Sequence, residues 1–296
     1  MRMTTALLTS LMMLICVAPR AAFAVAPVQR EFTEREEANQ TYRLTAGARV
    51  EVSSIRGSVD ITTSDSDTAE VTIIRTARTR ADLDYHKIEV EQTGNSLVVR
   101  GIQEPEERRH KNVQVNHHVI LRLPRRIDLT VNSISGTLKS TDLDGPTRVN
   151  SVSGSVELGN VNGKLQVNSV SGNVDVGNVG ADARVNSVSG SVGLGQVDGS
   201  LEVTSVSGSL NVTLASLSPQ GIHIKSVSGS VEIGFKTDVN ADFRAESVSG
   251  KVHLDFSNVI LDTSESNSSN VHARIGSGGT PIVISSVSGS IRVTRS

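Results

Sequence analysis

The chain has 296 residues, a formal net charge of −2 and 2% aromatic residues, with no tryptophan. It therefore has neither the basic field that attracts nucleic acid nor the aromatic platforms on which bases stack. Its single cysteine, Cys16, excludes an intramolecular disulfide and a metal site built from several thiolates.

Residues 1–24 have the features of a bacterial signal peptide. Arg2 supplies a positive start, residues 6–18 form a short apolar stretch, and Ala22-Phe23-Ala24 offers a cleavage site. Pro19 ends the apolar stretch well short of the roughly 20 residues that a membrane-spanning helix needs. We therefore expect export to the periplasm, the cell surface or the medium, and no transmembrane segment after cleavage.

Polar and charged residues dominate the next segment, 25–41, which we expect to be a flexible lead-in. Strand signals begin near Tyr42. Residues 54–61, which contain Gly57, look like a divergent copy of the repeat that follows. Residues 88–99 alternate on both sides of a Gly-Asn turn and predict a β-hairpin.

The middle of the chain continues this pattern. The charged residues 104–111 predict a surface loop, and residues 115–123 predict a strand that Pro124 closes. No segment keeps a helical period over three turns, which indicates an all-β fold.

The C-terminal half repeats the motif Ser-x-Ser-Gly. Its glycines are Gly136, Gly154, Gly172, Gly190, Gly208, Gly229, Gly250 and Gly289, spaced first by 18 residues, then by 21, and finally by 39. A fixed period of this size indicates a repeat architecture. We predict a parallel β-helix, or β-solenoid, with 18–21 residues per coil and a right-handed form favoured. It is expected as one domain, 42–296, with the repeat array at 126–296.

Residue parity within a coil predicts which side chains face inward, because residues two apart on a strand share a face. In the coil 165–179, this argument places corners at Asn168-Ser169, at Gly177-Asn178 and around Gly163. It predicts two interior columns. The first contains Val152, Val170, Val188, Val206, Val227, Val248 and Val287, and the second contains Val156, Val174, Val192, Leu210, Val231, Val252 and Ile291.

The same alternation of residues predicts polar columns on the outside. The second serine of each motif, such as Ser153 and Ser171, is expected to face solvent. Asn132, Asn150, Asn168 and Asn186 are expected to line a corner as a ladder of stacked amides.

On these residues, the chain resembles the bacterial β-strand-repeat proteins of unknown function that are labelled putative adhesins, which are related to autotransporter adhesin-head domains. The resemblance rests on Val50 to Ile61 with Gly57, on Leu121-Arg122-Leu123-Pro124, on the Ser-x-Ser-Gly ladder, and on the closing Gly278-Gly279-Thr280-Pro281-Ile282 to Ile291. It covers about residues 42–296. It implies a right-handed parallel β-helix or a related solenoid, an envelope or secreted location, and no catalytic residues.

The chain offers no predicted catalytic, cofactor-binding or metal-binding residue. The aligned turns at 142–145, 160–163 and 196–199 alternate Asp, Asn and Gln, whereas calcium usually needs several carboxylates. His117 and His118 would point to opposite faces of a strand and so could not chelate one ion together. The expected function is that of a non-enzymatic structural or surface-interaction module in the bacterial cell envelope.

Two other functions remain as alternatives. Parallel β-helices also bind or degrade polysaccharides, although paired carboxylates are sparse along this array. Flat hydroxyl columns would also suit ice binding. The partner is unknown, and one expectation is self-association through the C-terminal coil, Ser286 to Thr294, because an uncapped last coil would leave a strand edge unpaired. A specific function is also expected where the repeat is interrupted. These places are residues 104–118, the insert after Thr263 and residues 286–296.

Overall fold

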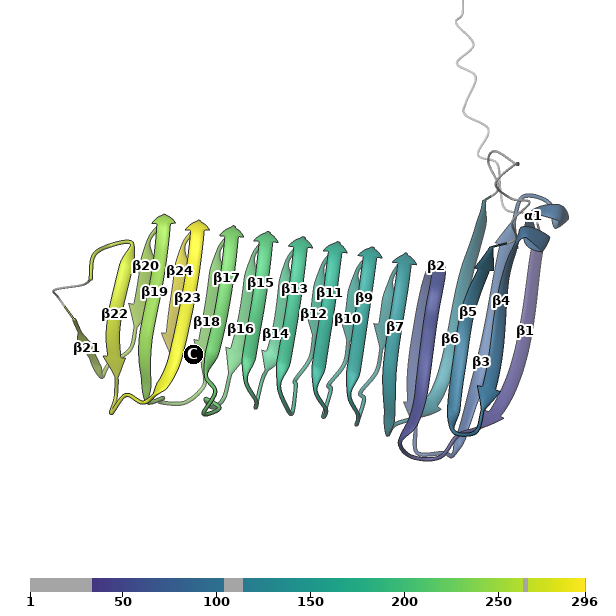
Figure 1. The fold of residues 1–296 in the computed structure, drawn as a ribbon, viewed down its shortest axis with the longest axis horizontal. Coiled ribbons are helices and arrows are strands. Elements are labelled where there is room, and N and C mark those ends of the chain that lie inside the picture. The colour runs from purple at the N-terminus through teal and green to yellow at the C-terminus, as the bar shows by residue number, and fades with distance from the viewer. Residues whose placement is uncertain (1–33, 104–113, 263–265, 296) are drawn as a thin grey trace, which may run out of the picture. The chain divides into compact units, whose positions relative to one another are not determined.

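The computed structural model describes residues 34–103, 114–262 and 266–295, which belong to one compact unit. The predicted signal peptide and the charged loop 104–111 lie outside these residues. The described part is a β-solenoid in which successive coils stack in parallel register (Figure 1). It contains no helix that is long and apolar enough to span a membrane.

Each coil of the array contributes one strand to each of two sheets, here called sheet A and sheet B. The strands of sheet B are β7 (Ile127–Ser135), β9 (Thr147–Ser153), β11 (Leu165–Ser171), β13 (Ala183–Ser189), β15 (Leu201–Ser207), β17 (Ile222–Ser228), β19 (Ala241–Ser249) and β23 (Thr280–Ser288). The strands of sheet A are β8 (Leu138–Ser140), β10 (Val156–Leu158), β12 (Val174–Val176), β14 (Val192–Gln196), β16 (Leu210–Leu214), β18 (Val231–Phe235), β20 (Val252–Asp255) and β24 (Ile291–Arg295).

The repeat period is visible directly in the strand register. Val167 pairs with Val185, and Val174 pairs with Val192, so equivalent residues 18 positions apart lie beside each other. A third side of the coil is marked by single parallel bridges that join Leu143, Val161, Val179 and Val197. The interior is a continuous stack of Val, Leu and Ile side chains. The predicted solenoid and its coil length are therefore confirmed.

The N-terminal part begins the stack with longer strands. These are β1 (Glu34–Arg43), β2 (Ala48–Ser64), β3 (Thr68–Ala77), β4 (His86–Thr93), β5 (Ser96–Gln103) and β6 (Val115–Pro124), with one short helix, α1 (Arg80–Tyr85). The long strand β2 belongs to both sheets, pairing with β7 in sheet B and with β6 and β8 in sheet A. Strands β4 and β5 form the predicted hairpin, with Thr93 opposite Ser96.

The expectation of a flexible lead-in at 25–41 is wrong from residue 34 onward. Strand β1 pairs antiparallel with β3 along its whole length, from Glu34 opposite Ala77 to Arg43 opposite Thr68. The charged side chains of this segment do not indicate a strand. An edge strand can nevertheless expose such side chains to water while its backbone hydrogen-bonds to a neighbouring strand. Arg75 of β3 also binds Glu36 of β1 at 2.8 Å.

The C-terminal coil is not at the end of the stack, which corrects the expectation of an uncapped last coil. Strand β23 pairs with β17 on one side and with β19 on the other, and β24 lies likewise between β18 and β20. The chain thus skips one coil position, builds β19 and β20, and returns to fill the gap (Figure 1). The antiparallel strands β21 (Val259–Leu261) and β22 (Asn270–Ile275) extend sheet B beyond β19.

The first predicted interior column is also wrong, since its valines face outward. Val170 is 49% exposed, whereas Ser169 before it is 3% exposed. Strand β11 runs unbroken through Asn168 and Ser169, so the corner lies at Gly172 and not at Asn168-Ser169. An apolar residue is expected inside, but here the inner position next to the corner is taken by the smaller serine. The second column, from Val156 to Ile291, is buried as predicted except at Val252, which is partly buried at the end of the stack.

The glycine of the motif makes this corner. Gly172 has φ +118°, a conformation that side chains disfavour, and a Cβ placed on it would lie 2.3 Å from the carbonyl oxygen of Gly154 in the preceding coil. Gly57 on β2 belongs to the same column of corner glycines, because a Cβ placed on Gly136 would lie 2.2 Å from the carbonyl oxygen of Gly57. Residues 54–61 are therefore a divergent copy of the motif.

Candidate functional site

The outer surface of sheet B carries a ladder of exposed apolar side chains, which we call the valine ladder. In spatial order it contains Ile134, Val152, Val170, Val188, Val206, Val227, Val287 and Val248. Ile134 is 38% exposed, the next six are 44–54% exposed, and Val248 at the end is 80% exposed. Contiguous exposed apolar surface is typical of interaction sites, whereas single exposed apolar residues need no explanation.

An amide column runs beside the valine ladder, two residues earlier on each strand. The side-chain Nδ2 of Asn150 donates to Oδ1 of Asn132 at 2.7 Å, and Asn168 and Asn186 repeat the bond at 2.7 and 2.8 Å. The predicted amide ladder is confirmed, although it lies within the strands and not at a corner. The column continues through Thr204, Lys225, Ser285 and Glu246.

The far end of the valine ladder forms the floor of a groove of about 780 Å³. Val206, Val227, Val287 and Val248 line the floor. Asn267 and Ser269, from the segment between β21 and β22, and Asn270, the first residue of β22, also line it. Backbone bonds from Ser247 to Ser269 and from Val252 to Ser268 hold this segment against the last coil. The Ser- and Asn-rich insert that interrupts the repeat thus contributes to the groove at the end of the ladder.

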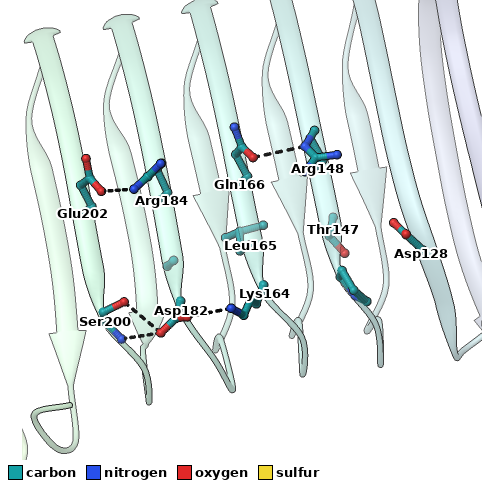
Figure 2. A pocket seen from close by; sticks show the side chains of 12 residues that line it. Asp128, Thr147, Arg148, Lys164, Leu165, Gln166, Asp182, Arg184, Ser200 and Glu202 are labelled. Atoms are coloured by element: carbon teal, nitrogen blue, oxygen red, sulfur yellow. Dashed lines mark hydrogen bonds and ion pairs between the residues drawn. The ribbon is translucent and has the colours of Figure 1, made fainter. Parts of the chain in front are cut away.

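A second, polar groove of about 420 Å³ lies at the opposite margin of sheet B (Figure 2). Arg148 donates to Gln166 at 3.2 Å, Arg184 binds Glu202 at 2.5 Å, and Lys164 lies 3.3 Å from Asp182. These contacts join equivalent positions of successive coils. Surface pairs of this kind contribute little stability, and here their main effect is to neutralise charge along the stack.

The acidic turns considered for calcium serve as acceptors between coils. Oδ1 of Asp142 accepts from the backbone N–H of Asn160 at 2.8 Å, and Asn160 and Asn178 accept in the same way from the coils that follow them. At another turn, Asp182 accepts from the backbone and hydroxyl of Ser200, and these bonds lower the pKa of its carboxyl group. Within the described ranges, no group of three or more His, Cys, Asp or Glu side chains is arranged to hold a metal ion.

His117 and His118 do point to opposite sides of β6. His118 lies on the outside, with Nε2 2.6 Å from Asp60. His117 is buried, with Nδ1 3.1 Å from the carbonyl oxygen of Arg56 and its ring 6.0 Å from that of His86. Burial lowers the pKa of His117 to about 4, so the side chain is neutral near pH 7. It is a core residue and takes no part in the outer surface of sheet B.

The family model and one solved structure agree with this architecture. The family model described as Toastrack DUF4097 matches residues 48–294. The structure of a putative adhesin from Bacteroides fragilis is 12% identical, with a TM-score of 0.50, and the match covers 87% of this chain and 97% of that one. A putative cell adhesion protein from Clostridium sporogenes is 12% identical with a TM-score of 0.33, covering 89% and 100% of the two chains. No curated protein matches the sequence.

Proposed function

The chain belongs to the Toastrack DUF4097 family, and on that premise we propose that it is an exported, non-enzymatic module that binds a surface or protein partner in the bacterial cell envelope. Its similarity to the Bacteroides fragilis structure is one of fold. Export is supported by the signal-peptide features of residues 1–24, which lie outside the described part of the chain.

The observation that carries the proposal is the valine ladder. Eight apolar side chains stand in one exposed row, and the amide column beside them is uncharged over its first five members, from Asn132 to Thr204. Interfaces typically have an apolar centre that is depleted of charge, with polar groups at the rim. The polar groove of Figure 2 supplies such a rim, in which Lys164 pairs with Asp182 and Arg184 pairs with Glu202.

A structural role for the polar residues supports the non-enzymatic part of the proposal. The carboxylates of Asp142 and Asp182 accept hydrogen bonds from the backbone of the adjacent coil. A catalytic carboxylate would instead need its oxygens directed toward a substrate. Asp142 and Asp182 thus bond the adjacent coil with the oxygens that a catalytic carboxylate would direct at a substrate.

Binding to envelope particles tests the proposal. Labelled wild-type protein is added to sedimentable envelope vesicles of the source cells, and the bound fraction is measured against concentration. We expect saturable binding that Val188→Lys weakens at least about tenfold, because it places a charge in the centre of the ladder. The matched control is Asn211→Lys, which adds the same charge to an exposed position of sheet A. Equal binding by the Val188→Lys variant and the wild type would show that the ladder is not the binding surface.

A further inference from the structure

We propose that the valine ladder binds a second copy of this chain, with the two stacks running in opposite directions about a two-fold axis. This inference rests on the proposed function, since it names the partner of the same surface. Its first support is the spacing. Neighbouring coils are about 4.8 Å apart, so the eight members of the ladder form a regular row. A second copy has the same spacing by construction, and its side chains can interdigitate along the whole row without losing register.

The direction follows from the charges. Sheet B has three outward columns, represented on β13 by Arg184, Asn186 and Val188. Two copies can face each other with like columns matched only if the two-fold axis is parallel to the strands, which reverses the order of coils. Val188 then lies opposite Val206 of the second copy, and Ile134 lies opposite Val248.

In this arrangement, no like charges oppose each other in the three columns. In the column that contains Arg184, this residue lies opposite Glu202 of the second copy, and the pair occurs twice because of the two-fold axis. In the amide column, Lys225 lies opposite Asn168, and Glu246 lies opposite Asn132. The reversed pairing therefore places opposite charges against each other near its centre and amides against Lys225 and Glu246.

The area suits a reversible dimer. Eight coils span roughly 34 Å, and three columns about 6.6 Å apart cover roughly 20 Å, which gives about 700 Å² per copy. The total of about 1,400 Å² falls within the range of specific protein interfaces. The groove at the end of the ladder would receive the first ladder residues of the second copy, Ile134 and Val152, beside Asn267 and Asn270.

Sedimentation velocity over a wide concentration range tests the pairing. We expect the wild type and the control Asn211→Lys to form dimers reversibly, and Val188→Lys to remain monomeric where they are dimers. The double variant Val188→Thr/Val206→Thr keeps the shape and β-branching of both side chains and should weaken the dimer while the fold stays intact. A wild type that is monomeric at every concentration, or ladder variants that dimerise as the wild type does, would overturn the inference.

Chemical cross-linking tests the direction. In a Cys16→Ser background, Ile134→Cys and Val248→Cys are prepared separately and mixed with a short bis-maleimide, which suits facing sheets about 10 Å apart. We expect cross-links in the mixture and little within either variant alone, because residues 134 and 248 lie at opposite ends of the ladder. Efficient cross-linking of each variant to itself would contradict the reversed arrangement.

The two proposals fail in distinguishable ways. If the wild type is monomeric but Val188→Lys still abolishes binding to envelope vesicles, the ladder binds another partner and only the self-pairing inference is wrong. If neither dimerisation nor vesicle binding depends on Val188, the proposed function is wrong as well.

Discussion

Ser187 and Val188 are consecutive residues of β13, and they lie on opposite sides of the coil wall with their polarities reversed. Ser187 is 3% exposed and Val188 is 48% exposed. The same reversal occurs in all eight Ser-x-Ser-Gly copies between Ser133 and Gly289, because each first serine is buried and each following valine or isoleucine is exposed. An outward row of β-branched residues suits a strand surface, and it also provides the apolar surface for the proposed pairing.

Replacing valine by threonine should have different effects at two positions of the same coil. Val188→Thr should change the free energy of unfolding of the monomer by no more than about 0.5 kcal/mol, because the position faces water. Val192→Thr should cost about 1–3 kcal/mol, because Val192 is buried and its new hydroxyl would lack a partner. Urea unfolding at low protein concentration measures both, and equal costs would contradict the outward orientation of Val188.

The buried serine should be replaceable by alanine. The hydroxyl oxygen of Ser187 is buried and has no hydrogen-bond partner in the described residues. Removing such a group is expected to be neutral or slightly stabilising, whereas Ser187→Val should overpack the position by about 1–3 kcal/mol. Thermal unfolding compares the two variants, and a large loss of stability in Ser187→Ala would indicate a hydrogen bond that the structure lacks.

The corner glycine should not tolerate a side chain. Gly190 has φ +117°, and a Cβ on it would lie 2.3 Å from the carbonyl oxygen of Gly172. We expect Gly190→Ala to cost at least about 2 kcal/mol through backbone strain and steric conflict. Gly180→Ala is the control, since the nearest atom to its Cβ would be 3.3 Å away. Similar urea midpoints for the two variants would argue against the corner at Gly190.

Acid should destabilise the protein through His117. Burial lowers the pKa of this side chain to about 4 in the folded state, below the unfolded value of about 6.5. The unfolded state therefore binds more protons between these values, and stability should fall as pH decreases from 6.5 to 4, by about 3 kcal/mol in total.

The variant His117→Gln removes this titration and provides the comparison. Its free energy of unfolding should change less than that of the wild type between pH 6.5 and 4. An identical pH dependence in the two proteins would mean that other groups cause the acid sensitivity.

Much of the fold was predictable because the period is strict. Glycines spaced by 18 residues predicted the coil, and equally spaced asparagines predicted the amide ladder that Asn150 and Asn168 form. The position of the last coil was not predictable, since Ser226, Ser247 and Ser286 belong to nearly identical motifs and any order would pair them. The chain alone does not reveal that β23 lies between β17 and β19.

Hydrophobicity alone does not predict the valine ladder, because it assigns apolar residues to the interior. Valine is more often buried than serine, and this average preference placed Val170 inside and the corner at Asn168-Ser169. Two exposed residues in succession, Val170 and Ser171, occur because the chain turns at Gly172 directly afterwards. The glycine of each copy was the local signal that could have located the corner.

The rate at which maleimide labels Val188→Cys, measured against protein concentration in a Cys16→Ser background, reports both the exposure of the valine ladder and its pairing. We expect rapid labelling in dilute solution, where Val188 faces water, and strong protection at concentrations where the second copy covers the ladder. A thiol that is protected even in dilute solution, or one that is labelled equally fast at every concentration, would contradict an exposed valine ladder that pairs with itself.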